Sequence, residues 1–224
     1  MKKDLKSYQK HNQEYIDSIN SYHRKDEVLK RTEKLNIFKN SGFEFAISLL
    51  NPKIETHIDI GTGSGWLPAK TSVYFKNVIG IEPSHVAVNL AKTINEKNKN
   101  VTILEADMVD GLKSLKTNVP VFITTATVLN HIEDYYVSDF LSVINNLPID
   151  SCLFFAERYD KNMQWEMWHV RNKDWWRENL PNWQLCFFDL QDDGYPSGIF
   201  GVCKGKEKVL STHKKNLLAK LVWK

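Results

Sequence analysis

The sequence predicts an α/β fold built on a doubly wound, mostly parallel β-sheet with helices on both faces. Three observations support this prediction. Short apolar runs alternate with helical patterns at regular spacing over residues 56–156, as they do in parallel sheets with crossover helices. Several of these runs end in an acidic or polar residue, and a glycine-rich loop follows the first run. In such sheets, ligands bind at the carboxyl ends of the strands.

The first strand and the loop after it organise the chain. Residues 56–66 read THIDIGTGSGW, a buried strand that contains Asp59 and a loop with glycine at every second position. Glycines let the backbone turn tightly and present N–H groups without Cβ atoms in the way, and Pro68 fits the start of a helix at 67–75. A dinucleotide fingerprint requires glycine where Trp66 stands. A nicotinamide enzyme and a merely structural turn stay open at this point.

The next two strands also lead into carboxylates. Residues 78–82 form the second strand, and Glu82 closes it at the place where a carboxylate accepts hydrogen bonds from both hydroxyls of a ribose. Ser84 then caps a helix. Residues 101–104 form the third strand, which runs on to Asp107.

The second half of the chain continues the alternation and then changes. Residues 121–125 read as a central parallel strand, and a helix at 134–147 carries its apolar residues on one face. A fifth strand covers residues 151–156. The stretch 158–183 is rich in tryptophan and has a helix start near residue 172. The runs 183–190 and 199–203 predict an antiparallel hairpin.

Together, four segments resemble the motifs of the class I S-adenosylmethionine-dependent methyltransferases of the small-molecule type. These are Asp59-x-Gly61-x-Gly63-x-Gly65, the second strand with its helix, Glu105 to Met108, and the stretch 127–134 around His131. The resemblance covers about residues 41–203. It implies a Rossmann-like seven-stranded sheet with an antiparallel last strand, and S-adenosylmethionine as the cofactor. The residues assigned to the cofactor are Asp59, Gly61, Gly63, Gly65, Glu82, Pro83, Asp107, Met108 and Thr124.

The resemblance also places His131 where the methyl group points. A histidine near its free pKa can take a proton from an acceptor hydroxyl, although His131 could instead contact the cofactor or the backbone. The residues assigned to the acceptor are Asn130, Glu157, Tyr159, Trp168, His169 and Arg171. Glu157 could equally cap its strand or pair with Arg158, and the tryptophans could simply cover the sheet. No metal site is expected, because the fourth strand offers threonines rather than clustered carboxylates.

The expected activity is methylation of a small molecule, with O-methylation of a sugar or another metabolite hydroxyl preferred. The alternatives are a small-molecule N-methyltransferase, a non-catalytic protein that binds S-adenosylmethionine, and a nicotinamide-dependent oxidoreductase. The formal net charge of +3 is too small to indicate a nucleic-acid partner. No run is apolar and long enough to span a membrane. Three cysteines without metal-ligand spacing favour a reducing compartment, so a cytoplasmic protein is expected.

The 224 residues suit a single globular domain. Residues 1–40 are polar, but Tyr8, Tyr15 and Tyr22 recur at helical intervals. We therefore expect an N-terminal helical lid over residues 1–40, with a plain surface helix as the alternative, and a methyltransferase domain over 41–224. An apolar helix at 43–50 precedes the first strand. The abundance of Lys, Asn and Ile is typical of an AT-rich microbial genome and favours a bacterial source.

Overall fold

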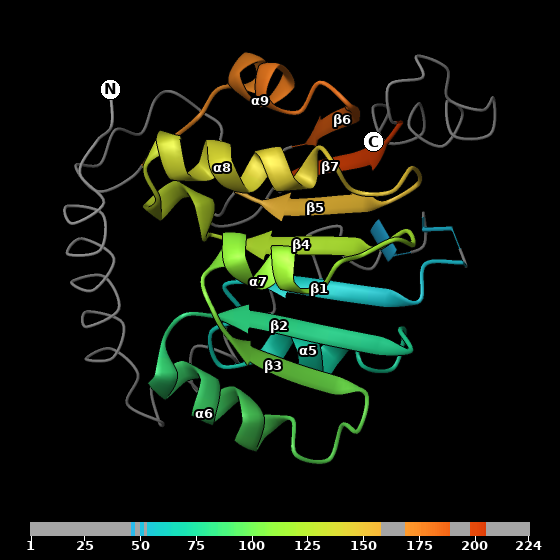
Figure 1. The fold of residues 1–224 in the computed structure, drawn as a ribbon, viewed down its shortest axis with the longest axis vertical. Helices are drawn as coiled ribbons and strands as arrows, with labels where there is room; N and C mark the ends of the chain where they lie inside the picture. Colours follow the sequence, from blue (N-terminus) through green and yellow to red (C-terminus); the bar gives the residue numbers. More distant parts are fainter. Residues whose placement is uncertain (1–45, 48–49, 52, 158–168, 189–197, 205–224) are drawn as a thin grey trace.

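The computed structural model describes residues 46–47, 50–51, 53–157, 169–188 and 198–204 (Figure 1). Their centre is a seven-stranded sheet in the order β3-β2-β1-β4-β5-β7-β6. Its strands are β1 (Thr56–Ile60), β2 (Asn77–Glu82), β3 (Val101–Glu105), β4 (Phe122–Ala126), β5 (Cys152–Ala156), β6 (Trp183–Phe188) and β7 (Gly198–Cys203). All pairs from β3 to β5 are parallel, and β7 is antiparallel to both β5 and β6. The predicted fold class is confirmed.

Helices cover both faces of this sheet. They are α5 (Trp66–Thr71), α6 (His85–Ile94), α7 (Met108–Ser114), α8 (Asp134–Ile144) and α9 (Lys173–Asn179), with a short 3₁₀ helix, η1 (Leu129–His131). Figure 1 shows α7 and α8 in front of the sheet and α5 behind it. The larger hydrophobic cluster joins α7, α8 and α9 to one face, and a second cluster joins α5 to the other. Such two-sided cover explains why β1, β4 and β5 are almost continuously buried.

Most predicted elements are found within a few residues of their expected ends, but two helices differ. The helix after the glycine loop ends at Thr71 instead of continuing to residue 75, and the next residues, Val73 and Tyr74, are exposed. Helix α7 was not predicted. It is short and has Gly111 in its middle, which lowers helix propensity, yet a Cβ there would lie 2.7 Å from Ile81 of β2. Close packing on the sheet thus requires this glycine.

The predicted N-terminal lid at 1–40 lies outside the described residues, as does most of the expected helix at 43–50. Of that helix, Ala46 and Ile47 are described and helical, and Ala46 is buried against the second cluster. Across the described ranges, no helix is long and apolar enough to cross a membrane.

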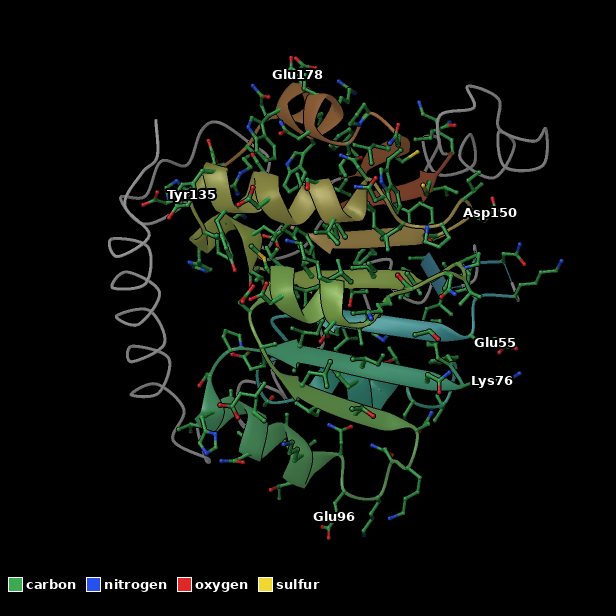
Figure 2. All side chains as sticks on the ribbon, viewed as in Figure 1. Glu55, Lys76, Glu96, Tyr135, Asp150 and Glu178 are labelled. Atoms are coloured by element: carbon green, nitrogen blue, oxygen red, sulfur yellow. The ribbon has the colours of Figure 1, made fainter. Side chains whose placement is uncertain are left out.

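The carboxyl ends of the parallel strands meet at one edge of the sheet, on the left in Figure 1. Figure 2 shows Tyr135, at the start of α8, near this edge, whereas Glu55 and Lys76 form an ion pair at the opposite edge. The chain leaves β1 toward β2 and β3 and later returns beside β1 as β4. The strand order therefore reverses between β1 and β4, and ligands of doubly wound sheets bind at this switch point.

Candidate active site

The glycine loop after β1 has the backbone shape that its sequence predicts. Gly61, Gly63 and Gly65 have φ angles of 66°, 52° and 75°, which residues with a Cβ rarely adopt. A Cβ on Gly61 would lie 2.5 Å from Val128, and a Cβ on Gly65 would lie 2.7 Å from Ala91. By contrast, no described atom comes within 4 Å of a Cβ built on Gly63. The middle glycine therefore borders open space, where a ligand can approach the backbone.

Asp59 supports this loop from below and is only 3% exposed. Its two carboxylate oxygens accept hydrogen bonds of 2.7 Å from the hydroxyls of Thr62 and Thr124. Burial raises the pKa of Asp59 to about 7, although both hydroxyl bonds act in the opposite direction. Thr124 also lies 2.8 Å from Nε2 of His57, and Nδ1 of that ring lies 2.8 Å from Thr71. Asp59 and Thr124 thus belong to a buried hydrogen-bonded chain.

Glu82 connects the end of β2 to the same loop. One carboxylate oxygen accepts the Gly63 N–H at 2.9 Å, and the other accepts the Ser84 N–H at 3.0 Å. Burial raises the pKa of Glu82, and the two backbone bonds partly offset this effect. Since an ionised carboxylate oxygen can accept two hydrogen bonds, each oxygen has capacity for one more donor, such as a ribose hydroxyl. Pro83, which follows, is half-buried.

Asp107 caps helix α7 with its side chain. Its Oδ1 accepts the N–H groups of Val109 and Asp110 and the hydroxyl of Tyr136. Burial alone would raise the pKa of Asp107, but these hydrogen bonds outweigh it and lower the pKa. All three donors reach the same oxygen, so Oδ2 has acceptor capacity for a ligand. Met108 is the first residue of the helix and is buried.

The loop after β4 is held by Glu157, which is fully buried behind it. The carboxylate accepts three consecutive N–H groups, from Val128 at 2.9 Å, Leu129 at 3.1 Å and Asn130 at 3.2 Å. It also accepts the Thr125 hydroxyl at 2.8 Å. Burial raises the pKa of Glu157, and these four bonds oppose the shift. Glu157 therefore fixes the backbone of the loop, and every described contact of its carboxylate is internal.

Arg171 holds the same loop from the side of the tryptophan-rich stretch. Its guanidinium donates to the carbonyls of Leu129 at 2.7 Å and Ile132 at 2.5 Å. It also donates to the His169 carbonyl and forms an ion pair with Asp134 at 2.9 Å. Only 3% of Arg171 is exposed. Arg171 was predicted to bind the acceptor, but the described partners of its guanidinium all belong to the protein itself.

Asn130 and His131 lie in the loop that Glu157 and Arg171 fix. Burial, followed by the charge of nearby His169, lowers the pKa of His131 below its usual value, so this imidazole is neutral at neutral pH. The backbone N–H of His169 donates to the Asn130 carbonyl at 2.7 Å, which joins the two segments. The predicted residues Asn130, His131, Glu157, His169 and Arg171 therefore lie together, whereas Tyr159 and Trp168 fall outside the described residues.

Two residues of the site were missed from the sequence. Val128 sets the spacing between the β4 loop and the glycine loop, because its side chain occupies the space beside Gly61. Tyr136 reaches Asp107 from the start of α8. The sequence offered one sign of this role of Tyr136: it precedes Val137, which belongs to the apolar face of the helix predicted at 134–147. Thr124, predicted to touch the cofactor, is instead buried within the chain of hydrogen bonds below the loop.

A glycine cradle at the switch point, with carboxylates at or just beyond the ends of the next two strands, is a site for a nucleotide-like ligand in a doubly wound sheet. Residues 14–192 match a family model described as a methyltransferase domain. The chain belongs to this methyltransferase family, which confirms the resemblance seen in the sequence. No curated protein matches the chain in sequence.

Solved structures share the fold at low sequence identity. A structure of CalS10 with bound SAM, an amino pentose methyltransferase of Micromonospora echinaspora involved in calicheamicin biosynthesis, has a TM-score of 0.65 at 10% identity, covering 81% of this chain and 98% of that chain. The DhpI–SAH complex gives 0.62 at 13%, covering 86% and 96%. The magnesium protoporphyrin IX methyltransferase ChlM of Synechocystis with bound SAM gives 0.59 at 15%, covering 76% and 82%.

Proposed function

We propose that this protein transfers a methyl group from S-adenosylmethionine to a hydroxyl of a small molecule, with His131 as the general base. S-adenosylmethionine is the cofactor, because the chain belongs to a methyltransferase family and its structural neighbours hold SAM or SAH. The residues present fit that molecule. Gly63 borders open space, and Glu82 and Asp107 carry spare acceptor capacity where a ribose and an amino group could be held.

The observation that carries the proposal is the place of His131. It ends η1, directly after the strand that adjoins β1 at the switch point. When bound, S-adenosylmethionine supplies an activated methyl carbon, whose bond to sulfur breaks as the acceptor oxygen bonds to it. His131 takes the hydroxyl proton, and its lowered pKa keeps the ring ready to accept one. Glu157 and Arg171 hold the loop so that little reorganisation is required.

The cofactor assignment is tested by calorimetric titration with S-adenosylhomocysteine, with NADH as the control. Gly63→Ala is the most direct variant, because the added methyl group enters the open space beside the loop. Since the φ angle of 52° at Gly63 strains any side chain, thermal unfolding checks that the variant stays folded. We expect the wild type to bind S-adenosylhomocysteine alone and Gly63→Ala to bind at least about tenfold more weakly. Binding of NADH instead would overturn the assignment.

The acceptor is tested with methyl-labelled S-adenosylmethionine and a panel of sugars, other alcohols and amines. O-methylation is supported if the wild type transfers the methyl group to an alcohol and the His131→Ala variant does not. If the acceptor is instead an amine and His131→Ala keeps nearly full activity, the proposal of O-methylation is wrong and N-methylation takes its place, because methylation of an amine needs less help from a base. Among the neighbours, CalS10 is described as an amino pentose methyltransferase, which supports placing sugars first in the panel.

A further inference from the structure

The side-chain carboxamide of Asn130 is buried without a hydrogen-bond partner. The residue is 0% exposed, and neither its Nδ2 nor its Oδ1 has a partner. In the described part of the chain, each of the other buried side chains of this kind has a single polar atom without a partner. These atoms are Asn145 Oδ1, Trp176 Nε1 and Trp183 Nε1. Asn130 therefore has both its donor and its acceptor unused. Leaving such a group unpaired destabilises the folded protein, so its presence calls for an explanation.

The backbone around this carboxamide is among the most constrained in the site. The Asn130 N–H donates to Glu157 and its carbonyl accepts from His169. The residue before it is bonded on both sides, with its N–H held by Glu157 and its carbonyl held by Arg171. These bonds prevent the loop from turning the side chain out into water. The carboxamide is thus held in a buried position, without a partner in the protein, by the structure that surrounds it.

Its place in the fold points to the acceptor. Two residues earlier, Val128 packs beside Gly61 of the cofactor loop. The next residue is the proposed base, His131, and His169 joins Asn130 to the tryptophan-rich stretch. Asn130 therefore lies between the cofactor side and the expected acceptor side of the site.

The chemistry of the neighbouring groups limits what this side chain can recognise. Arg171 and Glu157 are engaged by backbone groups and by Asp134, so their charges are not available to an ionic acceptor. An ammonium group would satisfy only Oδ1 and would leave Nδ2 unpaired. A carboxamide presents one acceptor and one donor side by side. Two adjacent hydroxyl groups match this pair, because one donates to Oδ1 while the other accepts from Nδ2.

We propose that Asn130 determines specificity for an uncharged acceptor that carries a vicinal diol. This inference rests on the proposed function. The test uses two probes that differ by one hydroxyl, trans-1,2-cyclohexanediol and cyclohexanol, with the S-adenosylhomocysteine complex of the full chain. Saturation-transfer NMR gives both affinities. In the wild type, the diol is expected to bind about tenfold more tightly than the mono-alcohol, as one well-placed pair of hydrogen bonds allows.

Asn130→Leu keeps a similar volume and removes both polar atoms, so it should abolish the preference for the diol. Asn118→Leu is the matched control at an exposed residue before β4 and should retain the preference. The melting temperature of Asn130→Leu should equal or exceed that of the wild type, because an unpaired buried group is removed. A diol preference that persists in Asn130→Leu, a wild type without one, or a melting temperature that falls by more than about 4 °C would each overturn the proposal. Failure of the wild type to bind S-adenosylhomocysteine would instead refute the proposed function.

Discussion

At the scale of single residues, the chain of hydrogen bonds from Thr71 to Asp59 admits two arrangements of its protons. When Asp59 is ionised, Thr124 donates to it, His57 donates from Nε2 to Thr124, and Thr71 donates to Nδ1. When Asp59 is protonated, each bond reverses, and Thr71 then donates to the Leu67 carbonyl 3.0 Å away. His57 is neutral in both arrangements, since burial lowers its pKa to about 3. The tautomer of His57 therefore reports the charge of Asp59.

We predict that His57 changes from the Nδ1–H to the Nε2–H tautomer as the pH rises through the pKa of Asp59, about 7. The ¹⁵N chemical shifts of the two ring nitrogens, measured between about pH 5 and about pH 9, distinguish the tautomers. In Asp59→Asn, which cannot ionise, the tautomer should stay the same throughout. A wild-type ring that keeps one tautomer while Asp59 titrates would contradict the proton arrangement.

Asp59→Asn should also change the pH dependence of stability. Between about pH 4 and about pH 7, Asp59 ionises in the unfolded chain and keeps its proton in the folded one, so its contribution to stability falls as the pH rises. The stability gain of Asp59→Asn over the wild type should therefore grow over this window and level off above it, at no more than about 4 kcal/mol. Urea unfolding at several pH values measures the difference. A gain that is constant from pH 4 to pH 8 would contradict the raised pKa.

At the scale of elements, Asp107 combines two duties that substitution can separate. It caps α7, and its spare oxygen is proposed to hold the cofactor. Serine also caps helices well, whereas alanine does not. We predict that Asp107→Ser retains more stability than Asp107→Ala, by about 1 kcal/mol, while both variants bind S-adenosylhomocysteine weakly. Thermal unfolding and calorimetry test the two effects; normal binding by Asp107→Ser would remove this residue from the cofactor site.

The loop after β4 should depend on Glu157 and Arg171 together. Glu157→Gln places an N–H₂ group opposite backbone donors, so we predict a loss of about 1–3 kcal/mol in the free energy of unfolding. Glu133→Gln is the matched control, since Glu133 makes no side-chain cap bond to α8. Because Arg171→Met frees carbonyls of the same loop, the double variant should lose less than the sum of the two single losses. Full additivity would show that the two side chains act independently.

The strands were predictable because their information is local: apolar runs, alternating glycines and polar strand ends all lie within a few residues of each other. Helix α7 was not, since Gly111 is explained only by its contact with β2. The site divides in the same way. The sequence predicted that His131 and Glu157 both follow strand ends, and Glu157 binds the loop that contains His131. By contrast, the pairing of Arg171 with Asp134, far apart in the chain, depends on the fold. The sequence indicated which residues come together at the strand ends. Which of their polar groups are left to bind a ligand depends on the packing of the folded chain.

At the scale of the whole molecule, β7 lies between β5 and the edge strand β6, and its neighbours leave little room beside it. Gly201 lies opposite Leu153 of β5 and Leu185 of β6, and a Cβ there would lie 3.0 Å from the side chain of Leu153 and 2.8 Å from that of Leu185. We predict that Gly201→Val lowers the free energy of unfolding by about 1–3 kcal/mol through overpacking. Urea unfolding measures the loss.

The position of β7 also has a consequence for the order of folding. In the described sheet, β6 pairs with β7 alone, and β7 is the later strand in the chain. Until residues 198–203 have been synthesised, the edge of β5 has no neighbour and β6 has nowhere to attach. A nascent chain therefore exposes an apolar strand edge of the kind that promotes aggregation. Insertion of β7 both completes the described sheet and covers the exposed edge of β5. Efficient production in cells therefore depends on how quickly β7 inserts.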